Sequence, residues 1–371
     1  MYSAQSGMTA RANSLPHISS APTKGKDSDR ANNFDLIRLF GALQVAVVHA
    51  TEHLHAVRLE PLVGFLGYLP GVPIFFTVSG FLVSLSLERA RSVRQYSTNR
   101  ALRIFPGLWA CVALSFLMVV AAGIELPHAG SVLSWFAAQF TIAQFYNPPW
   151  LRGFGVGVLN GSLWTIPVEL QFYAALPLLA WWAGRRSGRW ALLAVVAGTV
   201  MVSLRTWGPP RTSLLGKFLS VSLAPYLFFF LVGILLRYAY EKHPAYFRGR
   251  ALWWALVYAA WVCVEIIFGI PGSTGNLLNI GSIALLSTLV VSAAFSSESL
   301  SGRLLGTTDI SYGLYIYHMP VVNLALVNGV VGPAGVACAL LVSIGLAILS
   351  WKTVERPALG LKRYSIKGRA Y

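Results

Sequence analysis

The sequence predicts an all-α membrane protein, a polytopic transmembrane helical bundle of about ten spans with both termini in the cytoplasm. Its composition predicts this class. Hydrophobic residues make up 56% of the 371 residues and charged residues only 11%, and the mean hydropathy is +0.61. A soluble chain carries about 25% charged residues. Apolar stretches of membrane-spanning length recur along most of the chain, without the short alternating segments of an outer-membrane barrel.

Ten segments have the length and hydropathy expected of spans. They cover residues 34–54, 64–87, 106–124, 162–182, 190–206, 218–236, 251–269, 277–296, 310–327 and 333–351. Residues 1–33 are polar and lack the apolar core of a signal peptide, so we expect a disordered cytoplasmic tail there. Residues 358–371 are predicted to form a basic cytoplasmic tail.

The lysines and arginines set the expected orientation. With the N-terminus inside, nearly all of them fall in the tails, the inner loops or the inner ends of spans. Those left on the outer side are Arg58, Arg152, Arg205, Arg211 and Lys217. This asymmetry is the orientation signal of a multi-pass inner-membrane protein. It also accounts for the net charge of +16, so we expect no nucleic-acid partner.

The same distribution of lysine and arginine places residues 125–161 in a long outer loop. Segment 131–146 within it is apolar, but 16 residues give only about 24 Å of helix, short of a bilayer core of ~30 Å. If this segment crossed, the basic cluster Arg185, Arg186 and Arg189 would face outward. We therefore expect an interfacial or re-entrant helix. Loops of this length are often functional.

No metal site is predicted. Cys111, Cys263 and Cys338 all fall in predicted spans, where they are expected to be small core residues rather than ligands or disulfide partners. His49 and His53 have the i, i+4 spacing that zinc can use, but no third ligand of the HExxH type follows.

Arg38 and His49 place two ionisable groups inside the first predicted span. Such groups are costly in a bilayer and usually face a cavity or a partner. Eleven residues bring His49 back to within roughly 20° of Arg38, about 16 Å further along the helix. One face would then carry a fixed charge and a titratable imidazole, as in a proton-transfer centre coupled to an anionic ligand. The alternative is a snorkelling Arg38 and a packed, neutral His49.

Arg100 and Arg103 form a second basic pair at i and i+3, just before Pro106. The two guanidiniums share one helix face at the cytoplasmic surface and suit phosphate oxygens. Pro106 is expected to restart the chain into the third span. The alternative is a plain positive-inside anchor.

Three more polar residues lie at membrane depth. Ser79, beside Gly80, marks either a helix-packing notch or a ligand contact. Glu169 lies about 10 Å from the outer side, at a depth like that of His49, which it would orient unless it makes only a structural hydrogen bond. His318 follows a stripe of tyrosines that is either polar or packed core.

Together these stretches resemble acyltransferase family 3 of bacterial membrane proteins. The resemblance covers Asn33 to Pro357, and so implies one acyltransferase domain over residues 34–357. It rests on Arg38-x10-His49, FFTVSGFL at 75–82, Arg100-x-x-Arg103-Ile-x-Pro106, SLWTIPVELQFY at 162–173, ISYGLYIYH at 310–318 and Val354-Glu355-Arg356-Pro357. Pro73 stands where many relatives carry an acidic residue, so no role is assigned there.

The resemblance implies transfer of an acyl group, usually acetyl, from a cytoplasmic acyl-CoA to a hydroxyl of a cell-envelope or secreted carbohydrate. The expected partners are acyl-CoA, most simply acetyl-CoA, a carbohydrate or glycolipid acceptor, and the bacterial inner membrane. The positions that match characteristic family residues are Arg38, His49, Arg100, Arg103, Glu169 and His318.

A mechanism follows as an expectation. Arg100 and Arg103 would hold the phosphates of CoA, and His49 would take the proton of the acceptor hydroxyl. Ser79, His318 or a tyrosine of the stripe before His318 would stabilise the oxyanion beside the donor. The competing hypothesis is a transporter or flippase of a polar lipid or sugar, since buried ionisable groups also serve proton relays. The paired inner arginines and the lack of a visible inverted repeat favour the acyltransferase.

Overall fold

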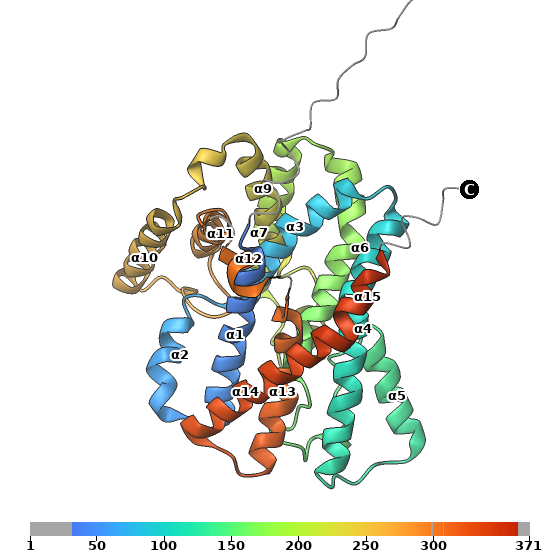
Figure 1. Cartoon of the computed structure of the whole chain (residues 1–371). Coiled ribbons are helices and arrows are strands. Elements are labelled where there is room, and N and C mark those ends of the chain that lie inside the picture. Colours follow the sequence, from blue (N-terminus) through green and yellow to red (C-terminus); the bar gives the residue numbers. More distant parts are fainter. Residues whose placement is uncertain (1–31, 298–299, 307, 363–371) are drawn as a thin grey trace, which may run out of the picture.

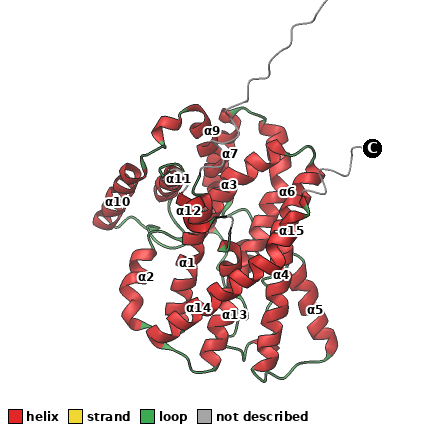
Figure 2. Cartoon of the chain, in the orientation of Figure 1, coloured by secondary structure: helices red, strands yellow, loops and turns green. Residues whose placement is uncertain are grey.

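The computed structural model describes residues 32–297, 300–306 and 308–362, and these fold as helices and loops without a strand (Figure 2). The predicted tails at 1–31 and 363–371 lie outside the described residues. The longer helices are α1 (Phe34–His53), α3 (Gly71–Arg89), α4 (Val93–Ala121), α6 (Thr165–Ala183), α7 (Ser187–Trp207), α9 (Leu227–Lys242), α10 (Ala251–Phe268), α11 (Ile280–Ala294), α13 (Ser311–Val327) and α14 (Gly332–Ser350). The shorter ones are α2 (Glu60–Leu66), α5 (Ala129–Phe140), α8 (Leu214–Ser220), α12 (Leu300–Leu305) and α15 (Arg356–Gly360). Single turns are η1 (Val57–Leu59), η2 (Pro149–Leu151), η3 (Gly161–Trp164), η4 (Pro244–Tyr246) and the π-turn η5 (Trp351–Glu355).

The predicted fold class is confirmed: the chain is a helical membrane bundle. Seven helical segments of the described chain are long and apolar enough to cross a membrane: Phe34–His53, Val57–Arg89, Val93–Ala121, Gly161–Ala183, Ser187–Trp207, Ala251–Phe268 and Gly332–Gly360. Helices α9, α11 and α13 occupy the other three predicted spans, and crossing by these shorter helices stays a prediction.

Helix α1 runs through the middle of the bundle (Figure 1) and packs against α3, α13 and α14. Helix α3 in turn packs along α9, and the two backbones touch. A Cβ on Gly80 would lie 2.0 Å from the carbonyl oxygen of Phe230, and one on Gly233 would lie 2.2 Å from that of Thr77. Only glycine permits this approach. The crossing fixes α3, which lines the cavity described below.

Helix α4 shows that the prediction for Pro106 is wrong. The helix begins at Val93, where the Ser92 side chain accepts a hydrogen bond from the Gln95 backbone amide, and it passes through Pro106 without a break. Within this added part, the buried Tyr96 donates to the Tyr173 carbonyl at 3.2 Å. Such tertiary contacts offset the backbone hydrogen bond that a proline removes. Arg100 and Arg103 therefore belong to the same continuous helix as the predicted third span.

The predicted span 218–236 is also displaced, because the chain breaks between α8 and α9. Gln171 of α6 replaces the missing helical bonds: its amide nitrogen donates to Val221 O at 3.0 Å, and its oxygen accepts from Leu223 N at 2.9 Å. The predicted helix at 131–146 exists as α5. It is only 12 residues long, about 18 Å of rise, and lies beside α4 (Figure 1). Its place at the membrane surface stays a prediction.

The long loop after α5 is tied to α13 on either side of His318. Pro320 lacks an amide hydrogen, so the carbonyl of Ile316 has no helical partner. Asn160 fills this vacancy by donating to Ile316 O at 2.7 Å. Further along α13, Asn323 accepts from Val156 N at 2.8 Å and donates to the carbonyls of Val158 and Leu159, both at 2.9 Å. The loop is thus bonded to α13 on both sides of His318.

Candidate active site

A cavity of about 400 Å³ lies between α1, α3, α4, α6 and α13. It follows α3 from Val83 to Val72, eleven residues or about 16 Å of helix rise. One mouth lies where α1 and α4 begin and α3 ends. We call this end of the molecule the basic end, because the cationic residues of the cavity gather there. These residues are Arg38, Arg100, Arg103 and Lys362.

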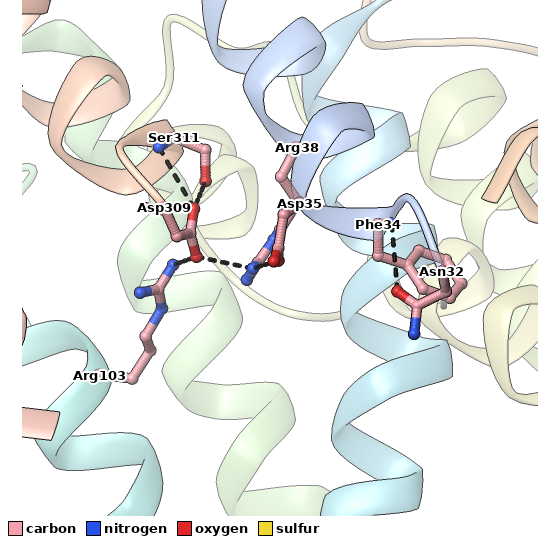
Figure 3. Close-up of polar contacts among 7 residues, drawn as sticks. All are labelled: Asn32, Phe34, Asp35, Arg38, Arg103, Asp309 and Ser311. Carbon is pink, nitrogen blue, oxygen red and sulfur yellow. Dashed lines mark hydrogen bonds and ion pairs between the residues drawn. The ribbon is translucent and has the colours of Figure 1, made fainter. Parts of the chain in front are cut away.

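Arg38 and Arg103 share one carboxylate, Asp309, which precedes α13 (Figure 3). The Nη2 atoms of Arg38 and Arg103 lie 2.7 and 2.6 Å from Asp309 Oδ2. The other oxygen of Asp309 accepts from the Ser311 hydroxyl at 2.6 Å, and Arg38 also pairs with Asp35. Burial opposes ionisation of Asp309, but the two guanidiniums outweigh it and hold the pKa of that carboxyl well below its usual range.

The cations are only partly neutralised. Neither Arg100 nor Lys362 forms an ion pair within the described part of the chain. Arg100 donates weakly to Ser86 at 3.4 Å and lies over the ring of Tyr173, 5.8 Å from its centroid. The Nε atoms of Arg38 and Arg100 are buried without a hydrogen-bond partner in the described structure. The cavity therefore offers unused guanidinium donors, as an anion site does.

Lys362 follows α15, which lies beside α4 at the basic end (Figure 1). Burial and the nearby charges of Arg100, Arg103 and Arg38 lower the pKa of the Lys362 ammonium to about 8. A ligand that brings negative charge would reduce the electrostatic repulsion between Lys362 and these arginines.

Glu169 lines the middle of the cavity and is held by two donors. Ser79 donates to its Oε1 at 2.7 Å, and the hydroxyl of Tyr173 donates to the same oxygen. The expected contact with His49 is not the one that the structure makes. Glu169 lies one turn of α6 from Tyr173, so the two side chains share a helix face and meet within the cavity.

His49 instead meets His318. Their ring atoms Nδ1 and Nε2 lie 2.9 Å apart and the rings are stacked, with centroids 5.2 Å apart. His318 is 1% exposed, whereas His49 is partly exposed. The face-to-face packing of α1 and α13 brings these residues together. His318 is thus a partner of His49, whereas the sequence analysis expected it to lie beside the donor.

Two aromatic rings of the cavity lining form an aromatic wall, and one of them, Tyr315, also contacts the histidine pair. Phe75 and Tyr315 both line the cavity and pack edge to face, with centroids 5.4 Å apart. Tyr315 lies 6.0 Å from the ring of His318 on its other side. Its hydroxyl is fixed at 2.9 Å from both Thr165 Oγ1 and Ser162 O.

The structure therefore gathers most of the sequence-predicted site residues in one place. Arg38, Arg100, Arg103, Ser79 and Glu169 line one cavity, and His49 and His318 form a pair beyond its aromatic wall. Sequence reasoning missed Asp309, Lys362 and Phe75 as site residues, and it considered Tyr315 only as one of the tyrosines of the stripe before His318. The FFTVSGFL and ISYGLYIYH stretches contained Phe75 and Tyr315.

The fold and the site define a helical membrane bundle that has a cationic cavity and a histidine pair. Residues 32–352 match the family model described as "Acyltransferase domain". The chain belongs to this family of acyltransferases and is an O-acyltransferase.

Three curated relatives agree. The chain is 34% identical to "Nodulation protein 10" of Rhizobium leguminosarum bv. viciae, over 92% of this chain and 96% of that protein. It is 25% identical to an O-acetyl transferase of Shigella phage Sf6, over 88% and 96% of the two chains. It is 24% identical to the Bacillus subtilis protein named "Putative peptidoglycan O-acetyltransferase YrhL", over 77% of this chain and 50% of that one. No solved structure matches the fold.

Proposed function

We propose that this protein transfers an acyl group, most simply acetyl, from cytoplasmic acyl-CoA to a hydroxyl of a cell-envelope or secreted carbohydrate. One observation carries the proposal: a single cavity joins unpaired cations at the basic end to an aromatic wall beside a histidine pair. Acyl-CoA is a long molecule with phosphates at one end and the reactive thioester at the other. The cavity likewise has cations at one end and the aromatic wall beside the histidine pair further along. The relatives named for O-acetyl transfer support the acetyl group and the hydroxyl acceptor.

The anionic end of CoA fits the basic end of the cavity. Arg100 and Lys362 make no ion pair within the described chain, and Arg100 also has a buried, unpartnered Nε. We assign these two residues to the phosphates, with Arg103 completing the cluster beside Asp309. The pantetheine arm would then follow α3 toward Phe75.

The histidine pair supplies the base. In the tautomer in which His49 Nδ1–H donates to His318 Nε2, the Nε2 lone pair of His49 is free to accept a proton. The acceptor oxygen attacks the thioester carbonyl as its proton passes to His49. The carbon–sulfur bond then breaks, and the CoA thiolate leaves and takes that proton. His318 is a positioning residue, since it acts through His49.

A binding assay and a turnover assay on the purified full-length protein test the two halves of this proposal. Arg100→Ala/Arg103→Ala is expected to lose the rise in melting temperature that acetyl-CoA gives to the wild type. His49→Ala is expected to keep that rise and to lose acceptor-dependent CoA release by 10²-fold or more, on the order expected for a general base.

Arg94→Ala is the matched control, because Arg94 is exposed on the same helix α4. It is expected to behave like the wild type. Full acetyl-CoA stabilisation of the double variant would contradict the phosphate role, and an active His49→Ala protein would contradict the base. A transporter would show no stabilisation by acetyl-CoA and no CoA release.

A further inference from the structure

A second cavity, of about 140 Å³, lies between α4, α5, η3 and the loop after α5. It differs from the donor cavity in chemistry, because none of its lining residues is charged. Aromatic rings and side-chain amides dominate the lining. The aromatic residues are Trp135, Phe145, Tyr146 and Trp164, and the amides are Gln139, Gln144, Asn147 and Asn160.

The amides of this lining serve two purposes. Three of them hold the loop: Gln139 donates to Tyr146 O at 3.0 Å, Asn147 donates to Gly157 O at 2.8 Å, and Asn160 donates to Ile316 O at 2.7 Å. Gln144 is different. Its amide nitrogen bonds the loop backbone, but its oxygen Oε1 is buried without a partner in the described structure, and the side chain is 4% exposed.

A buried amide oxygen without a donor is costly. A ligand that brings a hydroxyl or an N–H group into this cavity removes that cost. Flat aromatic faces next to amides suit a ring that is apolar on its faces and polar at its edge. The lack of charge in the lining favours a neutral ligand. A neutral sugar ring has all of these properties.

The cavity is also placed to serve the histidine pair. Its lining segment from Val158 to Gly161 is tied to α13 through Ile316 on one side of His318 and through Asn323 on the other. A ligand held there would be registered against the helix that carries His318. Its lining is bonded to α13, which also packs against α1, so the cavity suits a ring next to the one that is acylated.

We propose that this second cavity is a subsite for a neutral sugar ring of the acceptor, with Gln144 accepting a hydrogen bond from a hydroxyl or amide of that ring. This proposal rests on the proposed function for the identity of the acceptor, and it extends that function to where the acceptor is held.

Gln144→Leu and Tyr146→Ala in the full-length protein test the proposal. Tyr146 lines the cavity but is 43% exposed, so its side chain can be removed without opening the core. The probe is the envelope glycan of a strain in which the gene is deleted. Both variants are expected to raise the KM for this glycan about tenfold or more, as the loss of a specific polar contact does. The KM for acetyl-CoA is expected to stay as in the wild type.

Leu133→Ala is the control, since Leu133 is exposed on α5 and does not line the cavity. A direct glycan-binding assay, monitored by tryptophan fluorescence, separates the subsite proposal from the proposed function. Glycan binding that is weakened in both variants supports the subsite even where no acyl transfer from acetyl-CoA is found, a result that would overturn the proposed function alone. Unchanged glycan affinity and KM in both variants would overturn the subsite.

Discussion

Phe75 and Tyr315 form the aromatic wall of the cationic cavity, and they differ in how firmly they are held. The Tyr315 hydroxyl has two hydrogen bonds, whereas Phe75 has only packing contacts, including the face of α1 at Gly41. Phe75 is therefore the ring whose size can set how much acyl chain fits beside the histidines.

Phe75→Ala is expected to widen the range of acyl donors. The missing ring leaves room for several methylene groups, each worth about 0.8 kcal/mol when buried. The ratio of kcat/KM for butyryl-CoA to that for acetyl-CoA is expected to rise about tenfold. Phe40→Ala, at an exposed position of α1 outside the cavity lining, is the control. An unchanged ratio in Phe75→Ala and in the milder Phe75→Leu would contradict this role.

Residue chemistry predicted most of the site, but not what joins its members. Arg38, His49 and Glu169 are visible in the sequence because charge at membrane depth is costly. Asp309 is not, because it lies between predicted spans, where an acidic residue is unremarkable. Its partners Arg38 and Arg103 are 271 and 206 residues away. Similarly, the sequence did not pair His49 with His318, and only the tertiary packing of α1 and α13 shows that they meet.

At the scale of the elements, the chain after α14 builds part of the donor site. The π-turn η5 places Trp351 in the cavity lining and leads into α15, where Lys362 follows. Glu355 in this turn is buried and accepts from Ser350 at 3.0 Å. The sequence assigned residues from 358 onward to a basic tail. In the described part of this segment, Lys362 lines the cavity.

Lys362 is expected to make donor binding depend on pH. With a pKa of about 8 in the free protein, the ammonium is charged at neutral pH and loses its proton as the pH rises through 8. A bound phosphate favours the charged form and raises that pKa, so affinity is constant below the free pKa and falls above it.

Acetyl-CoA titrations across this pH range measure the effect. The Kd of the wild type is expected to rise by up to about tenfold per pH unit above 8, the limit for one proton. Lys362→Arg keeps its charge and is expected to show a flat profile. Lys362→Ala is expected to bind acetyl-CoA more weakly than the wild type at neutral pH, and its affinity is expected to fall little further as the pH rises. A wild-type profile that persists in Lys362→Ala would assign the titration to another group.

At the scale of the whole molecule, hydropathy predicted the bundle well because each span must be apolar along its own length. Boundaries were predicted less well, because side chains from other helices decide them. Hydrogen bonds from Gln171 hold the non-helical segment between α8 and α9. Contacts of Ser92 and Tyr96 accompany the extension of α4 on the N-terminal side of Pro106. The tie between the loop after α5 and α13 depends on Asn160 and Asn323, two amides that carry no local signal of their partner.

The bundle has two chemically distinct ends, and this predicts a sided reaction. The cationic cavity has its cations at the basic end, which the distribution of lysine and arginine predicts to face the cytoplasm. Acetyl-CoA does not cross a bilayer, so its access depends on which face of the protein it meets. Radiolabelled acetyl-CoA added outside sealed vesicles is expected to label glycan in inside-out vesicles and not in right-side-out ones. Permeabilisation should make the two equal, and Arg100→Ala/Arg103→Ala should reduce labelling in both. Labelling of intact right-side-out vesicles at or above the level of inside-out ones would contradict donor entry at the basic end alone, and would reassign the cationic cavity.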